Sequence, residues 1–101
     1  MSEPTGQQKK WLWEQCGFEW NDRIELWHDP IHGLVSSILP LPDLNNLFKY
    51  AVPKVIEELK EQGSVVPVIS LFSEWYDNIC TGLDYVSALF KTCFTILGGK
   101  E

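Results

Sequence analysis

The sequence predicts an α+β fold in which an antiparallel sheet of two hairpins packs against three helices, in the order α-β-β-α-β-β-α. Three observations lead to this prediction. The chain has 101 residues, of which 45% are hydrophobic and 22% are charged, as expected for a single folded domain over residues 1–101. Two long segments repeat apolar residues at steps of three and four, which is typical of amphipathic helices. Shorter segments alternate polar and apolar residues or are rich in valine and isoleucine, which is typical of strands.

The first helix is predicted over residues 5–15. Pro4 suits the beginning of a helix, and Gly17 is typical of its end. Trp11 and Trp13 point away from the face that carries the other apolar residues of this helix. We therefore expect either that other elements surround the helix or that one of these tryptophans is exposed.

The first hairpin is predicted to come after this helix. Residues 23–28 alternate polar and apolar side chains, so they predict a half-buried strand. Residues 29–33 (Asp-Pro-Ile-His-Gly) are typical of a turn, because proline presets φ and glycine accepts unusual backbone angles. Residues 34–39 are predicted to form the returning strand, which ends at Pro40 because proline has no N–H to donate.

The clearest helical segment is predicted over residues 43–59. Asp43 suits the N-terminal cap, because its carboxylate can accept a backbone N–H. Pro53 lacks an N–H and therefore predicts a kink or a break near residues 49–52. The apolar positions continue through the proline, which favours a kink; they are Leu44, Leu47, Phe48, Ala51, Val52, Val55, Ile56 and Leu59.

The second hairpin is predicted from residues 65–72 and 75–80. The run 65–72 is rich in β-branched residues and apolar on both sides, so we expect a strand in a part of the sheet that is covered on both faces. Pro67 places this strand at an edge of the sheet, or at the beginning of the strand itself.

The last helix is predicted over residues 85–97. Asp84 suits its N-terminal cap, and Gly98 and Gly99 end it. Its apolar stripe and that of the helix over 43–59 are expected to face the sheet. The stripe of the last helix consists of Val86, Leu89, Phe90, Cys93, Phe94 and Leu97.

The charge of the chain is acidic throughout. Lysine and arginine number 8 against 14 aspartates and glutamates, which gives a net charge of −6, and the two halves of the chain share this excess equally. Because no basic stripe exists to neutralise phosphates, we expect no direct binding to nucleic acid. The sequence has no apolar run of membrane-spanning length and no signal peptide in MSEPTGQQKK, which predicts a cytoplasmic protein without membrane contact.

The cysteines also suggest an intracellular protein. Cys16, Cys80 and Cys93 are odd in number and far apart in sequence, whereas a small secreted domain favours an even disulfide framework. We expect three free thiols. Cys93 lies on an apolar helical stripe and is expected to be buried.

No motif in the chain predicts a catalytic, cofactor or metal site. His28 and His32 have metal-ligating side chains, but they flank a proline in a predicted turn and lack further ligands nearby. Cys16 or Cys80 could act as a nucleophile only with a histidine as base, and neither lies in a local motif. The common glycine-rich nucleotide motifs and the serine-hydrolase motif are absent. The sequence therefore favours a protein that is not an enzyme.

The five tryptophans are the unusual feature of the composition. Tryptophan is enriched in the residues that dominate binding interfaces, but it also stabilises the cores of small domains. We expect both roles here, with exposure favoured at Trp11 and Trp27. The candidates for a contact surface are Trp11, Trp27, Trp13 and Trp75, and Trp20 is the fifth tryptophan.

Three segments resemble a known group of proteins. They are the stretch Pro42–Lys54 (PDLNNLFKYAVPK), the turn Trp27–Pro30 (WHDP) and Ala88–Phe90 (ALF) in the last helix. Together they resemble small uncharacterised proteins encoded by phages and prophages and described as having an α-β-α sandwich domain. The resemblance implies a phage or mobile-element origin and a helix–sheet–helix fold, and it implies no activity.

The sequence leaves three hypotheses for function. The first is a non-enzymatic protein-interaction module of mobile-element origin that binds a host protein, a phage protein or a second copy of itself. The second is an anti-defence factor or sponge that captures a small anionic nucleotide, with Arg23 and Lys49 or Lys54 as donors. The third is a small enzyme that uses a cysteine or a histidine.

Overall fold

The fold is α+β, with helices and a three-stranded antiparallel sheet, but the order of elements differs from the predicted one. The structure is a computed structural model, and it describes residues 4–31, 33 and 35–100. The elements are α1 (Gly6–Gln15), β1 (Glu19–Asn21), β2 (Leu26–His28), β3 (Val35–Ser36), α2 (Leu44–Asn46), the π-helical turn η1 (Leu47–Ala51), α3 (Val52–Glu61), α4 (Pro67–Cys80) and α5 (Tyr85–Ile96).

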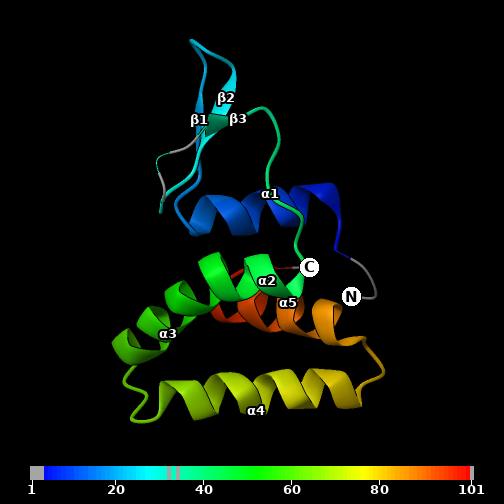
Figure 1. Ribbon diagram of the computed structural model, residues 1–101. Helices are drawn as coiled ribbons and strands as arrows, with labels where there is room; N and C mark the ends of the chain where they lie inside the picture. Colours follow the sequence, from blue (N-terminus) through cyan, green and yellow to red (C-terminus); the bar gives the residue numbers. More distant parts are fainter. Residues whose placement is uncertain (1–3, 32, 34, 101) are drawn as a thin grey trace.

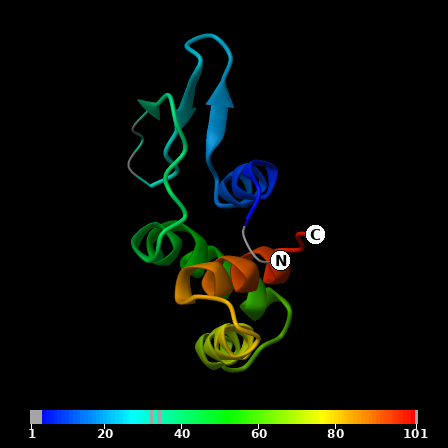
Figure 2. The same cartoon turned by 90° about the vertical axis from the view of Figure 1, so that its right-hand side faces the viewer.

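The helices stack on one another and the sheet lies at one end of the molecule, which measures 42 × 29 × 23 Å (Figure 1). Helix α1 lies beside the sheet, the continuous helix α2–η1–α3 packs with α5 in the middle, and α4 forms the outer layer at the opposite end (Figures 1 and 2). The expectation that the long helices face the sheet, as in a helix–sheet–helix sandwich, is therefore wrong. The apolar stripes of these two helices face each other and also the neighbouring helices α1 and α4.

The sheet is a small antiparallel meander in the order β1-β2-β3. Trp27 in the central strand pairs with Trp20 on one side and with Ser36 on the other. The predicted pairing of 23–28 with 34–39 is thus present over shorter strands, although position 34 lies outside the described residues. The strand β1 was not predicted, because Glu-Trp-Asn has three residues and one apolar side chain, which is too short for an alternating pattern.

The predicted second hairpin is wrong, because its residues from Pro67 onward form the single helix α4. Pro67 occupies the first turn of this helix, where its missing N–H is not needed. A run of apolar residues such as 65–72 fits a buried strand and a helix equally well when it is considered without its neighbours in sequence. The apolar residues Val68, Leu71 and Trp75 continue at steps of three and four, which is a helical pattern.

Helix α2–η1–α3 shows how the chain accommodates Pro53. Asp43 caps the helix as predicted, since its Oδ1 atom accepts the Asn46 N–H at 2.8 Å. The predicted irregularity near 49–52 is a π-helical turn, in which the Val52 N–H donates to the Leu47 carbonyl five residues earlier. Because a π-helical turn shifts the hydrogen-bond register, the helix continues through a residue that cannot donate.

The first and last helices agree with the prediction. Thr5 and Gln8 form a capping box at α1, with each side chain accepting the other's backbone N–H. Asp84 accepts the Ser87 N–H at 2.6 Å and caps α5. Cys93 on α5 is fully buried, as expected from its place on the apolar stripe.

Trp13 is the largest fully buried side chain. Its Nε1–H donates to the Pro40 carbonyl at 2.9 Å, and its ring lies edge-on to Phe18 and Tyr50, with centroids 5.8 and 6.1 Å away. The prediction that Trp13 contributes to a contact surface is therefore wrong. Its indole faces α2–η1 and the segment after β3, so the buried ring fills the core between these two elements.

A buried hydrogen bond fixes α4 against α5. Thr92 is fully buried, and its hydroxyl donates to the Ala88 carbonyl at 2.8 Å and accepts from the Asn78 side chain at 2.8 Å. Because a buried hydroxyl without a partner is costly, this pair sets which side of α4 faces inward.

Replacing the buried Trp13 and the exposed Trp20 by alanine should separate the core role from the surface role. We expect Trp13→Ala to lower the free energy of unfolding by roughly 3–5 kcal/mol, because it removes a large core side chain and leaves a cavity. Trp20 is 45% exposed, so Trp20→Ala should cost less than about 1 kcal/mol. Urea unfolding followed by circular dichroism measures both values, and equal losses would contradict the assignment.

Candidate functional site

Helix α4 carries an exposed apolar surface. Within residues 67–80, all of which the structure describes, only Leu71 is fully buried. By contrast, Ile69 is 64% exposed, Tyr76 is 66% exposed and Val65, just before the helix, is 93% exposed. We name this exposed region the α4 surface; it consists of Phe48, Val65, Val68, Ile69, Phe72, Trp75 and Tyr76.

The helical period explains why these side chains share one side of α4. At about 100° per residue, Val68, Ile69, Phe72 and Tyr76 fall within one arc of about 100°. This arc begins about 60° from the inward-facing Leu71 and ends nearly opposite it. The apolar arc of α4 is therefore wider than the side that α3 and α5 cover. Sequence reasoning missed these residues because it assigned them to strands; the spacing from 68 to 79 was the available signal.

Trp75 anchors the α4 surface to the rest of the fold. Its ring centroid lies 5.7 Å from that of Phe48 on η1 and 5.7 Å from that of Phe72 on α4. Its Nε1–H donates to the Tyr85 carbonyl at 3.0 Å. The structure thus places this predicted contact residue, which is half-buried, at the centre of an aromatic cluster that continues into the exposed flank.

The charged groups of α4 are all acidic. Glu74 and Asp77 are exposed on the side away from the apolar flank, and the helix contains no lysine or arginine. A hydrogen bond with Cys80 raises the pKa of the Tyr76 phenol above its ordinary value, so the hydroxyl stays neutral at physiological pH. The surface is therefore apolar and aromatic, and the carboxylates of α4 lie on the other side of the helix.

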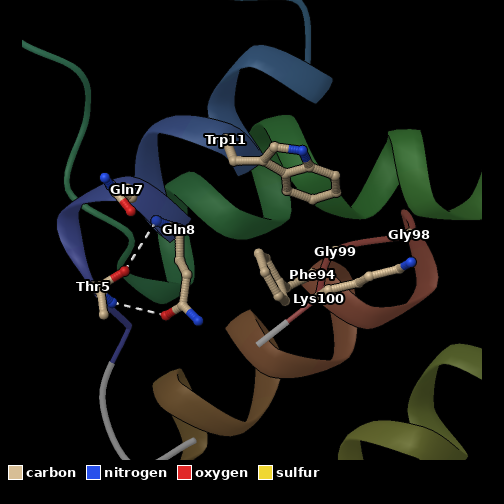
Figure 3. A pocket seen from close by; sticks show the side chains of 8 residues that line it. All are labelled: Thr5, Gln7, Gln8, Trp11, Phe94, Gly98, Gly99 and Lys100. Atoms are coloured by element: carbon tan, nitrogen blue, oxygen red, sulfur yellow. Dashed lines mark hydrogen bonds between the residues drawn. The ribbon is translucent and has the colours of Figure 1, made fainter.

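Trp11 lies in a separate hollow of about 580 Å³ between α1 and the end of α5 (Figure 3). Its ring lies edge-on to Phe94, with centroids 5.0 Å apart. The polar side chains Thr5 and Gln8 are engaged in the capping box, and Lys100 is the cation at the rim. Gly99 permits this arrangement, because a Cβ there would lie 2.6 Å from the Phe94 ring.

Trp27 lines a third region, a cleft of about 340 Å³ between the sheet and the helices. Its ring meets the exposed Trp20 edge-on at 5.3 Å. On another wall of the cleft, the Tyr50 hydroxyl donates to Asp29, and burial together with that carboxylate raises the pKa of Tyr50 to about 12. Trp11, Trp27 and Trp75 therefore belong to three separate parts of the surface, and the structure does not bring the predicted tryptophans together.

The residues of the enzyme hypothesis that the structure describes come from different elements, with Cys16 at the end of α1 and Cys80 at the end of α4. His28 is in β2, whereas His32 lies outside the described residues. Burial raises the pKa of both the Cys16 and the Cys93 thiol to about 12, so neither is a ready nucleophile. Within residues 4–31, 33 and 35–100 no group of three or more histidines, cysteines and acids could hold a metal ion.

The cations of the nucleotide hypothesis do not share a site. Arg23 lies in the turn after β1, and Lys49 on η1 lies over the Tyr50 ring at 5.2 Å. Lys54 on α3 is 4.0 Å from the carboxylate of Glu57. Capture of a nucleotide needs several donors around one hollow, so this arrangement gives that hypothesis no support.

No protein-family model, no curated protein and no solved structure matches the chain. The resemblance to phage-encoded proteins therefore stays a prediction. Among the helices of the described residues, none is long and apolar enough to cross a membrane.

The thiols should react according to their burial. At pH 8, a thiol with a pKa of about 12 is ionised to roughly one part in ten thousand, so Cys16 and Cys93 should label slowly. Cys80 is exposed and should label first. Alkylation followed by peptide mass spectrometry, with and without denaturant, measures the three rates. Labelling of native Cys93 as fast as that of Cys80 would contradict the structure.

Proposed function

We propose that the chain is a non-enzymatic protein-interaction module whose contact surface is the α4 surface. The observation that carries the proposal is the exposure of a row of large apolar side chains along one flank of a packed helix. Single exposed apolar residues are ordinary, whereas large contiguous apolar patches on a monomer are typical of interaction sites.

The composition of the α4 surface supports the proposal. Aromatic residues dominate binding energy in interfaces, and Phe72, Trp75 and Tyr76 lie together here, with Phe48 beside them. Trp75 is held by its hydrogen bond to Tyr85, so the centre of the surface is rigid before a partner arrives. A preformed aromatic centre reduces the entropy lost on binding.

The proposed partner is a protein of the host or of a phage, or a second copy of the chain, in the cytoplasm. Of the predicted tryptophans, Trp75 belongs to this surface. Trp11 and Trp27 line other hollows and have no part in the proposed contact.

A selection from a random peptide library tests the proposal without a known partner. Peptides enriched on the wild-type protein should lose at least about tenfold in affinity for Ile69→Glu or Tyr76→Glu, because a buried unpaired carboxylate opposes docking. Both side chains are more than half exposed, so neither change should disturb folding.

The matched control is Ile24→Glu, because Ile24 is 50% exposed in the turn between β1 and β2. The control should keep full affinity for the selected peptides. The proposal fails if no peptide is enriched, if binding is indifferent to Ile69→Glu and Tyr76→Glu, or if Ile24→Glu weakens it equally. Biolayer interferometry on the purified variants provides the affinities, and circular-dichroism melting confirms that each variant is folded.

A further inference from the structure

We infer that the partner of the α4 surface is an amphipathic helix whose apolar stripe is flanked by lysine and arginine. The inference rests on the proposed function and adds the secondary structure and the charge of the partner. Three features carry it: the spacing of the apolar side chains, the length of the stripe and the net negative charge of the chain.

The spacing along α4 matches the seam of a helix pair. Val68, Phe72, Trp75 and Ile79 on α4 are separated by four, three and four residues, which is the pattern of positions that interlock with a neighbouring helix. The core of the fold covers only part of this seam. The side chain of α4 that is fully buried is Leu71, which lies beside the seam and does not belong to it. The unused positions lie on the flank where a further helix would pack.

The stripe is long enough for a helix to lie along it. From Val68 to Ile79 it extends for roughly 16 Å at the rise of an α-helix. A partner helix of about 14–18 residues would cover it completely. A strand or a loop would meet the stripe only locally, since their side chains do not repeat at steps of three and four.

The charges select the partner. Helix α4 contributes Glu74 and Asp77 without any basic residue, and the whole chain has a net charge of −6. Electrostatic steering therefore favours a cationic partner over a neutral or acidic one. The same net charge opposes pairing of two copies, because each copy carries −6.

Three synthetic 18-residue peptides test the inference by fluorescence anisotropy. The first has leucines on one helical face and lysines elsewhere, and the second has glutamates in place of the lysines. The third has the composition of the first in a shuffled order without an apolar face. The wild-type protein should bind the first peptide at least about tenfold more tightly than either of the others, and added salt should reduce the difference between the lysine and the glutamate peptide.

The variant Ile69→Glu separates docking from bulk attraction between opposite charges. It makes the protein more acidic, so unspecific attraction of the lysine peptide would increase. Docking on the apolar flank should instead weaken at least about tenfold. The double variant Glu74→Gln/Asp77→Asn should keep the affinity for an apolar helix and reduce the preference for lysine over glutamate.

Each other outcome has a definite meaning. Equal binding of the lysine and glutamate peptides, both lost in Ile69→Glu, overturns the inferred charge and leaves the proposed function standing. Binding of the shuffled peptide as tightly as the first, or binding that Ile69→Glu does not weaken, overturns docking on α4 and the proposed function with it. If no peptide binds, and sedimentation shows a dimer that Ile69→Glu dissociates, the occupant of the α4 surface is a second copy of the chain. This result overturns the inference. Absence of both peptide binding and self-association overturns the inference and the proposed function together.

Discussion

The burial of Trp13 is the constraint that joins the sheet to the helices of this molecule. Phe18, which packs against its ring, directly precedes the sheet, and Pro40, which accepts its N–H, comes after the last strand. The third neighbour, Tyr50, lies on the π-helical turn and donates to Asp29 just after the central strand. The sheet is too small to be stable alone, so its position depends on this cluster around one indole on α1. The helices can then stack on one another without resting on the sheet, which is why the molecule is elongated.

At the opposite end, a few directional contacts determine what α4 exposes. Leu71 is buried, Asn78 is held by Thr92, and the indole of Trp75 is held by a carbonyl of α5. Turning α4 to bury Ile69 would break these contacts and leave the Thr92 hydroxyl in the core with fewer partners. The exposed flank is thus a consequence of how the helix is fixed, and the proposed contact surface results from the packing of the core.

The sequence was informative where structure is decided locally. The caps at Asp43 and Asp84 and the irregularity before Pro53 depend on hydrogen bonds within a few residues, and each lies where it was predicted. Residues 65–72 were assigned wrongly because a short β-branched run has the same composition in a strand and in a helix, and packing against other elements decides between them. The burial of Trp13 likewise depends on Phe18 and on segments distant in sequence, which composition and spacing do not place. The site was missed for the same reason, since an exposed flank exists only once the helix and its neighbours are known.

The central claim is that the flank of α4 is open to water in the isolated protein. It is tested most directly by nuclear magnetic resonance of methyl groups in dilute protein with a soluble paramagnetic agent, which accelerates relaxation of methyls that solvent reaches. The methyls of Val65 and Ile69 should relax strongly, whereas those of Leu71 and Val55, which are fully buried, should be nearly unaffected. Protection of Ile69 equal to that of Leu71 would contradict the account, because it would mean that the fold itself covers this flank.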